Sequence, residues 1–386
     1  MAQPMGLTAS DIVFSEATPE QRELAWELCG QTWAAPMSLE DYVERERHLA
    51  QHDLNRDGRC RYWVLYLKGY PRHIIASCEA TRKPILISDG GGRPARTSNG
   101  YAVTNIYTNP TYRRQGMASY LLRRVQEQMD ADSDCSVLYS DSGRSYYASL
   151  GWSPFGSRQA TLTLLPSSSS PSHASQNRNR TRLLEMSDLP DLCEADVHHL
   201  TKSFNSLPAD GKTRVAFLPT LPQISWHLSR AEFDARKILP LTGNLRLAKG
   251  AMVLNNSSNG NSKSWITWAH DWREKRLRIL RISRVCQDQA QVTLRTQEEL
   301  MRDVAALLDA AVGEARRWGL CKVIAWNPDE EVRTACKRVG NAYPGPEGVK
   351  VMFEERIEGG MPSLRWSEGR VVKDVAWEEN FGFCWC

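Results

Sequence analysis

The sequence predicts a mixed α/β fold built in two parts. Strand-like and helix-like patterns alternate along most of the 386 residues, as in α/β proteins. Hydrophobic residues make up 41% and charged residues 24% of the chain, which is typical of globular proteins. Residues 166–180 contain no acidic and almost no bulky apolar residue, so they cannot bury enough surface to offset their ordering entropy. We therefore expect a flexible linker at 166–180 between domains at 1–165 and 181–386.

The first part alternates short strand-like runs with helical segments. The expected elements are, in chain order, a strand at 11–17, helices at 18–33 and 38–53, strands at 61–67, 73–80 and 102–108, a helix at 117–130, a strand at 135–141, a short helix at 145–152 and a strand at 159–165. Helical periodicity is clear at 117–130, because Met117, Leu121 and Val125 fall on one face. The strand at 159–165 is expected to complete this half.

The second part, residues 181–386, predicts an α+β domain. The expected elements are a helical entry at 181–204, a hairpin of strands at 263–272 and 276–285, a long helix at 296–319, a strand at 321–326 and a helix at 327–340. This order echoes the first half, so the domain could be a degenerate copy of the same fold. Residues 377–385 resemble a buried strand, and the core is expected to take Trp265, Trp268 and Trp272.

Composition and charge exclude several classes of function. The 49 basic and 45 acidic residues give a net charge of +4 without a basic stripe, which argues against nucleic-acid binding. No apolar run reaches the roughly 20 residues that span a membrane, and the start lacks a secretory signal pattern. Ten cysteines without metal-ligand spacing argue against a metal site. We expect a cytoplasmic protein that binds neither metal, membrane nor nucleic acid.

The segment at 106–118 carries the most chemical information. It reads as a strand end, a turn containing Pro110 and a helix that opens with Arg-Arg-Gln-Gly-Met-Ala. The first N–H groups of a helix have no intrahelical partners, and small residues such as Gly116 let phosphate groups approach them. An ordinary turn between a strand and a helix would also explain this pattern.

At this point the chain resembles the Gcn5-related N-acetyltransferases (GNAT). Their acetyl-CoA motif, Gln/Arg-x-x-Gly-x-Gly/Ala, is matched by Arg113, Gly116 and Ala118, and their Tyr-x-x-x-Gly-aromatic motif by Tyr147 to Trp152. The resemblance implies that acetyl-CoA is the cosubstrate. The residues that it assigns to acetyl-CoA binding are Ile106, Tyr107, Thr108, Arg113, Arg114, Gln115, Gly116, Met117 and Ala118.

A closer resemblance is to the fungal lysine N-acetyltransferases of lysine catabolism. It rests on segments such as GQTWAAPMSLEDYVERERHL, SVLYSDSGRSYYASLGW and FLPTLPQISWHLSRAEF, and it extends over nearly the whole chain. The resemblance implies transfer of an acetyl group to the side-chain amine of free L-lysine or a similar small molecule. Two alternatives remain open: an N-acyltransferase of a fungal secondary-metabolite pathway, and an acyl-CoA-binding protein without turnover.

The reaction requires a group that removes a proton from the amine. At the position where family members commonly carry a glutamate, this chain has Ala102. Glu79 on the preceding strand is our candidate base, although it could be an edge-strand carboxylate paired with Arg82 or Lys83. Asp141 is a second candidate that could instead cap the following helix.

The resemblance assigns Tyr147 the protonation of the departing thiolate, whereas packing against its aromatic neighbours is the alternative. In the second part, Trp226, His227, Arg230 and Glu232 could line the substrate site or pack in the domain interface.

Overall fold

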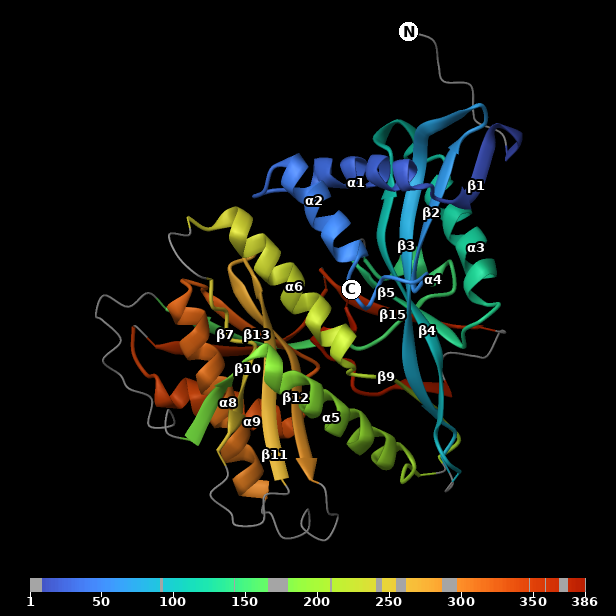
Figure 1. Ribbon diagram of the computed structural model, residues 1–386. Helices are drawn as coiled ribbons and strands as arrows, with labels where there is room; N and C mark the ends of the chain where they lie inside the picture. Colours follow the sequence, from blue (N-terminus) through green and yellow to red (C-terminus); the bar gives the residue numbers. More distant parts are fainter. Residues whose placement is uncertain are drawn as a thin grey trace.

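The computed structural model places two β-sheets side by side, with helices between and around them (Figure 1). The described residues are 9–90, 93–141, 143–165, 180–208, 210–240, 245–254, 262–286, 297–346, 348–357, 359–367 and 374–385. The predicted linker, apart from Arg180, lies outside these residues. The mixed α/β fold class is confirmed.

The first sheet is built mainly from the N-terminal half. Its described strands run in the spatial order β1 (Ile12–Glu16), β2 (Cys60–Leu67), β3 (Tyr70–Ser88), β4 (Arg96–Thr108), β5 (Cys135–Ser140), β15 (Met361–Trp366) and β6 (Ser153–Pro154), with β9 (Thr213–Phe217) on β3 and β16 (Val375–Trp377) on β9. The helical segments of this half are η1 (Ala9–Asp11), α1 (Pro19–Trp33), α2 (Leu39–Ala50), η2 (Pro110–Tyr112), α3 (Met117–Met129) and α4 (Ser145–Ala148). Thr18 starts α1 with a capping box to Gln21, and Ser38 caps α2.

The second sheet belongs mainly to the C-terminal half. Its described strands run in the order β14 (Val349–Glu355), β7 (Arg158–Leu164), β13 (Lys322–Trp326), β12 (Arg276–Cys286), β11 (Ser262–Asp271), β10 (Gly250–Val253) and β8 (Thr181–Leu184). The helical segments are η4 (Met186–Asp188), α5 (Leu189–Phe204), α6 (Leu221–Ile238), α8 (Gln297–Arg317), α9 (Glu330–Ala342) and η7 (Gly382–Cys384).

The two halves exchange strands. β7, expected to complete the first half, lies between β13 and β14 in the second sheet. In return, β15 pairs with β5, while β9 pairs with β3. The expectation for residues 159–165 is therefore wrong, because a strand joins the sheet that offers it a hydrogen-bonding edge, and sequence position does not determine that edge.

A hydrophobic cluster between the two sheets contains residues of both. α3 covers one face of the first sheet, where Leu121, Leu122 and Val125 are fully buried. Between the sheets, side chains from α5 and α6 pack against both, and Val137 of the first sheet and Leu280 of the second belong to the same buried cluster. α8 and α9 cover the far face of the second sheet. The interface between the halves is therefore core rather than surface.

Two further elements differ from expectation, and the tryptophan prediction is confirmed. Residues 377–385 do not form a strand: β16 ends at Trp377, and a 3-10 turn at Gly382–Cys384 follows, although Phe383 and Cys384 are fully buried. The helical entry begins with the strand β8. Trp265, Trp268 and Trp272 are buried core residues, as predicted.

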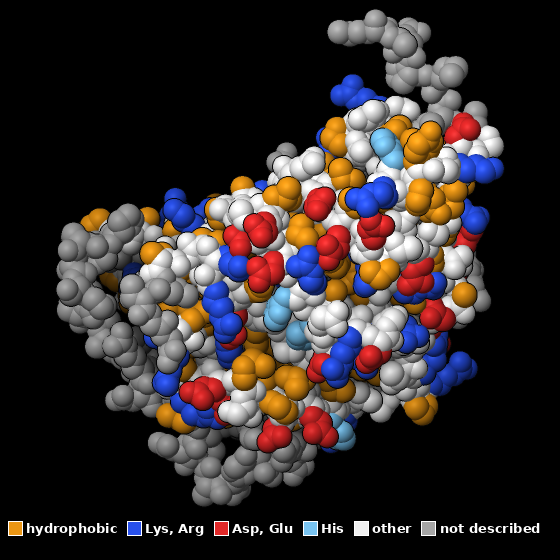
Figure 2. Space-filling view, turned by 45° about the horizontal axis from the view of Figure 1, so that its top comes forward, with side chains coloured by type: hydrophobic (Ala, Val, Ile, Leu, Met, Phe, Trp, Pro, Cys, Tyr) orange, Lys and Arg blue, Asp and Glu red, His pale blue; other side chains and the backbone are white. Residues whose placement is uncertain are grey.

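Acidic and basic side chains are interspersed over the face shown in Figure 2. Among the described residues, no helix combines the length and apolar character needed to cross a bilayer.

Candidate active site

A cavity of about 780 Å³ lies between the two halves. Its lining includes Glu79, Asp141 and Tyr147 from the first half and His227 and Arg356 from the second. The cavity therefore brings both predicted catalytic residues into one space and adds a wall from the C-terminal half. Its volume suits a small molecule.

Glu79 lies on β3 between β2 and β4, paired with Tyr62 and Thr104. The Trp26 indole N–H donates to Glu79 Oε1 at 2.9 Å, and the Asn105 side chain also bonds the carboxylate. Burial, reinforced by the nearby Glu46 charge, raises the pKa of Glu79 to about 7. A carboxyl group with this pKa can accept a proton near neutral pH.

The alternative view of Glu79 as a paired edge carboxylate is wrong. β3 is an interior strand, and Arg82 forms an ion pair with Asp132. The Lys83 ammonium is buried and donates to the Cys384 carbonyl at 3.1 Å. A pocket of about 10 Å³ beside Glu79, also lined by Trp26, is at the lower limit for one water molecule.

Tyr147 lies on α4, and its ring contacts Tyr146 with centroids 5.0 Å apart. Desolvation raises the pKa of the Tyr147 phenol, so its hydroxyl stays protonated at neutral pH and can donate a proton. Asp141 does not cap α4, whose N-cap Arg144 makes no side-chain capping bond. Instead Asp141 Oδ1 accepts from the Gly360 N–H at 2.8 Å.

β4 and β5 separate beside the cavity. Their parallel pairing runs from Gly100 to Ala102, but β4 continues to Thr108. Asn105 has a φ of 50° and lies at a register shift against β3, so β4 bulges there. Among the described residues, the edge of β4 that faces β5 is unpaired at 106–108, the three positions assigned to the pantetheine arm of acetyl-CoA.

The turn before α3 fits a pyrophosphate group. Gly116, the N-cap, has a φ of 79°, and a Cβ added there would meet no atom within 4 Å. The first intrahelical bond joins the Tyr120 N–H to the Gly116 carbonyl, so the N–H groups of Met117, Ala118 and Ser119 precede it. These donors and the open space at Gly116 suit phosphate oxygens.

Two side chains of the same turn bond to its own backbone. Arg113 Nε donates to the Thr108 carbonyl at 3.2 Å, and Gln115 Nε2 donates to the Thr111 carbonyl at 3.1 Å. Both side chains therefore hold the turn in shape. Arg114 has a φ of 61°, so the backbone at 114–116 takes two left-handed residues to reach the helix start.

Trp226, His227 and Arg230 on α6 line the cavity, whereas Glu232 pairs with Lys249. His227 is buried, and its Nε2 lies 3.1 Å from the Phe383 carbonyl, so the ring anchors the C-terminal segment. Burial lowers the pKa of His227 well below its usual value, which keeps the imidazole neutral.

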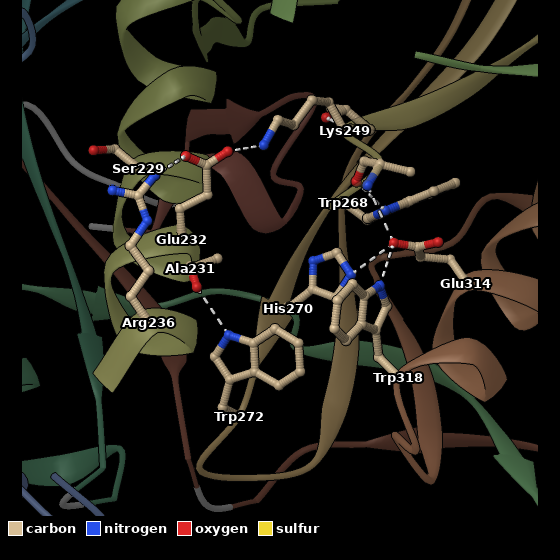
Figure 3. Close-up of polar contacts among 12 residues, drawn as sticks. Ser229, Ala231, Glu232, Arg236, Lys249, Trp268, His270, Trp272, Glu314 and Trp318 are labelled. Carbon is tan, nitrogen blue, oxygen red and sulfur yellow. Dashed lines mark hydrogen bonds and ion pairs between the residues drawn. The ribbon is translucent and has the colours of Figure 1, made fainter. Parts of the chain in front are cut away.

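A buried network supports this wall from behind (Figure 3). Glu314 Oε1 lies 3.1 Å from His270 Nε2 and accepts from the Trp318 indole at 2.8 Å. The His270 ring, which reaches the cavity, also stacks on Trp272. These contacts tie α8 to β11 and fix the cavity wall.

Three residues of the site were not recognised in the sequence. Trp26 bonds Glu79 from 53 positions away, and Asn105 reaches the same carboxylate from the bulge. Arg356 lines the cavity from the end of β14. Of the three, only Asn105 could have been suspected from the sequence, because it directly precedes the segment at 106–118 that contains the acetyl-CoA motif.

Comparisons with known proteins agree with this architecture. The family model described as "LYC1 GNAT-like C-terminal domain" matches residues 164–386, more than half of the chain. A second model, "Acetyltransferase (GNAT) domain", matches residues 91–155. A curated relative, the lysine acetyltransferase of Yarrowia lipolytica, is 22% identical over 407 residues, covering 92% of this chain and 94% of that protein.

Solved structures are also similar. A GCN5-related N-acetyltransferase from Kribbella flavida is 14% identical, covers 92% of this chain and 71% of its own, and has a TM-score of 0.47. Another from Anabaena variabilis is 13% identical, covers 92% and 73%, and has a TM-score of 0.48. The two family matches confirm the expected pairing of a GNAT domain and a GNAT-like C-terminal domain. The chain belongs to the family of the LYC1 GNAT-like C-terminal domain and is an acetyltransferase of the GNAT type.

Proposed function

We propose that this enzyme transfers the acetyl group of acetyl-CoA to the side-chain amine of free L-lysine or a closely similar small amine. The observation that carries the proposal is Glu79, a carboxyl group with a pKa of about 7 in a cavity shared with Tyr147. The curated relative named lysine acetyltransferase, which aligns with 92% of the chain, supports the choice of amine.

The proton balance explains why Glu79 matters. A lysine side chain has a pKa of about 10.4, so removing its proton at pH 7 costs roughly 4.6 kcal/mol. Glu79 accepts that proton directly or through one water in the adjoining pocket. Its bond from Trp26 and its neighbour Asn105 hold the carboxylate in position.

GNAT acetyltransferases use acetyl-CoA, which supplies an acetyl group activated as a thioester. In our proposal the backbone at Ile106, Tyr107 and Thr108 binds its pantetheine arm, and the turn at 113–118 binds its pyrophosphate. Tyr147 donates a proton from its hydroxyl to the leaving thiolate, because the raised pKa keeps that proton in place until it is needed.

We also propose a role for each region of the chain. Residues 1–165 bind acetyl-CoA, residues 166–180 link the two parts, and residues 181–386 cover the amine site. The cavity lining supports this division of roles, since Trp226, His227 and Arg356 reach the cavity from the C-terminal half. A site closed by a second half leaves room for a small molecule rather than a peptide.

A panel of free amines tests the proposal. The enzyme is incubated with acetyl-CoA and each amine, and the release of free thiol is followed. We expect L-lysine to give the highest kcat/KM. Preference for an unrelated amine would favour the secondary-metabolite alternative, and acetyl-CoA binding without thiol release would favour the non-catalytic one.

A further inference from the structure

Arg356 and Trp326 form a cationic pocket in the cavity wall. Neither residue takes part in the proposed proton transfers. The guanidinium Cζ lies 3.8 Å from the centre of the Trp326 ring, and the residue is only 7% exposed. Nε and Nη1 donate to the carbonyls of Ser157 and Gly360 at 3.1 and 2.9 Å. Nη2 is buried and has no hydrogen-bond partner among the described residues.

Arg356 forms no ion pair with a protein carboxylate among the described residues: the neighbouring Glu355 attracts its charge, but Glu355 Oε1 accepts hydrogen bonds from Ser157 and Arg144 instead. By contrast, Arg276 nearby pairs with Asp271 at 2.9 Å. Desolvation lowers the pKa of Arg356 to about 10, which reflects the cost of this charge. A buried cation with a spare N–H group beside a cavity suits an anionic ligand.

A second guanidinium shares the same aromatic wall. Arg278 Cζ lies 5.8 Å from the ring centre of Trp326 and 4.2 Å from that of Trp385. Trp326 thus lies close to two cations, and all of these residues line the cavity. The planar fork of arginine matches the two oxygens of a carboxylate.

An acidic group adjoins this cationic pocket. Gly360 donates its N–H to Asp141 and accepts from Arg356 through its carbonyl, so one residue links the two charges. A Cβ on Gly360 would approach the Trp326 ring to 3.1 Å, so a glycine allows this close packing. Opposite charges placed side by side match the ammonium and carboxylate that an α-amino acid carries on one carbon.

The strands of the first sheet give a minimum for the distance between this pocket and Glu79. Glu79 on β3 pairs with Thr104 on β4, and the pairing of β4 with β5 ends at Ala102 and Val137, two residues before Thr104 and Tyr139. The Tyr139 ring stacks on Trp326 at 5.6 Å. Two spacings of paired strands amount to about 10 Å, and this is a minimum separation of β3 and β5 here because β4 and β5 are no longer paired. An extended lysine spans about 7.5 Å from its side-chain nitrogen to its carboxylate carbon, and with a hydrogen bond of about 2.9 Å at each end it reaches about 13 Å, more than that minimum.

We propose that Arg356, assisted by Arg278, binds the α-carboxylate of the amine substrate and that Asp141 binds its α-ammonium group. This inference rests on the proposed function and makes the enzyme selective for α-amino acids whose side-chain amine reaches Glu79. Arg356 and Asp141 are then specificity-determining residues that take no part in proton transfer.

The first test needs no variant. L-lysine is compared with cadaverine, which lacks the carboxylate, and with 6-aminohexanoate, which lacks the α-amine. We expect kcat/KM to fall about 100-fold for cadaverine, as for loss of one partner of a buried charge pair, and about 10-fold or more for 6-aminohexanoate, whose lost ammonium faces a more exposed carboxylate. Equal kcat/KM for L-lysine and cadaverine would overturn the inference.

Two variants then assign the contacts. Arg356→Met should raise KM for L-lysine about 100-fold and leave kcat/KM for cadaverine unchanged. Asp141→Asn should lower kcat/KM for L-lysine but not for 6-aminohexanoate. Arg333→Met is the matched control, because Arg333 lies over Phe353 at 4.2 Å, outside the cavity. An equal loss for lysine and cadaverine in Arg356→Met would show a structural role only and contradict the inference.

Binding measurements separate this inference from the proposed function. L-lysine is titrated into the CoA-bound protein by calorimetry. Lysine binding that Arg356→Met abolishes, without acetyl transfer by the wild type, would support the head-group site and contradict the proposed function. Acetyl transfer with the same kcat/KM for L-lysine and cadaverine would support the proposed function and contradict the head-group site. If the wild type neither binds L-lysine nor transfers acetyl to it, both the inference and the proposed function are contradicted.

Discussion

Glu79 must be ionised to accept a proton, yet its surroundings oppose ionisation. Burial and the Glu46 charge raise its pKa to about 7, so the fraction of active carboxylate changes across neutral pH. The same environment that makes Glu79 a stronger base than an exposed glutamate also makes its charge costly in the folded protein.

Glu79→Gln removes the proposed base. We expect kcat to fall by about 100-fold or more, within the range for loss of a general base. In the wild type, kcat should rise with pH through about 7, as Glu79 loses its proton. The variant should lack that step. Glu16→Gln is the control, because Glu16 is the exposed last residue of the edge strand β1. A Glu79→Gln variant that keeps the step near pH 7 would exclude Glu79 as the base.

The same group predicts a pH-dependent stability difference. The folded pKa of about 7 lies above the usual value of 4.5, so the unfolded chain loses the proton first as pH rises. The wild type should therefore lose free energy of unfolding relative to Glu79→Gln between about pH 4.5 and 7, and denaturant titrations at both pH values measure this. A constant difference across that range would contradict the raised pKa.

Tyr147→Phe tests the proposed acid. We expect kcat to fall about 10- to 1,000-fold with little change in acetyl-CoA affinity, since the ring still packs and only the hydroxyl is lost. Tyr146→Phe is the control, because the Tyr146 hydroxyl lies 3.1 Å from Ser119 and outside the cavity lining. Wild-type turnover in Tyr147→Phe would leave Tyr147 a packing residue.

At the scale of elements, the start of α3 is the clearest candidate for anion binding. Gly116→Asp should abolish the thermal stabilisation that acetyl-CoA gives the wild type, because a carboxylate would enter the open space and repel the phosphates. Gly69→Asp is the matched control, since Gly69 has a φ of 80° and equally open surroundings in the turn between β2 and β3. An unchanged shift in Gly116→Asp would remove the pyrophosphate assignment.

Elements whose signals are local could be predicted from the sequence. The α3 periodicity and the Gly116 turn depend on residues within one segment, and both lie where the sequence places them. The sheet that β7 joins could not be predicted, because its partners β13 and β14 lie far along the chain. The contact between Trp26 and Glu79 was hidden for the same reason, and so was the balance of charge around Arg356.

At the scale of the whole molecule, strand exchange joins the halves. A fragment ending at Leu165 would lack β9, β15 and β16 and leave β7 without its sheet. A polar contact adds to this link, since Arg45 on α2 pairs with Asp234 on α6 at 3.3 Å. We therefore expect one cooperative unfolding transition in calorimetry. Two resolved transitions, with acetyl-CoA shifting only one, would contradict a shared core.

The central claim is that both halves enclose one site where a free amino acid is acetylated on its side chain. The most direct measurement is the structure of the product from acetyl-CoA and L-lysine, read by NMR or fragment mass spectrometry. We expect the acetyl group on the side-chain nitrogen, because Arg356 and Asp141 hold the α-groups while the distal amine meets Glu79. Acetyl on the α-nitrogen, or no acetyl-lysine at all, would contradict it.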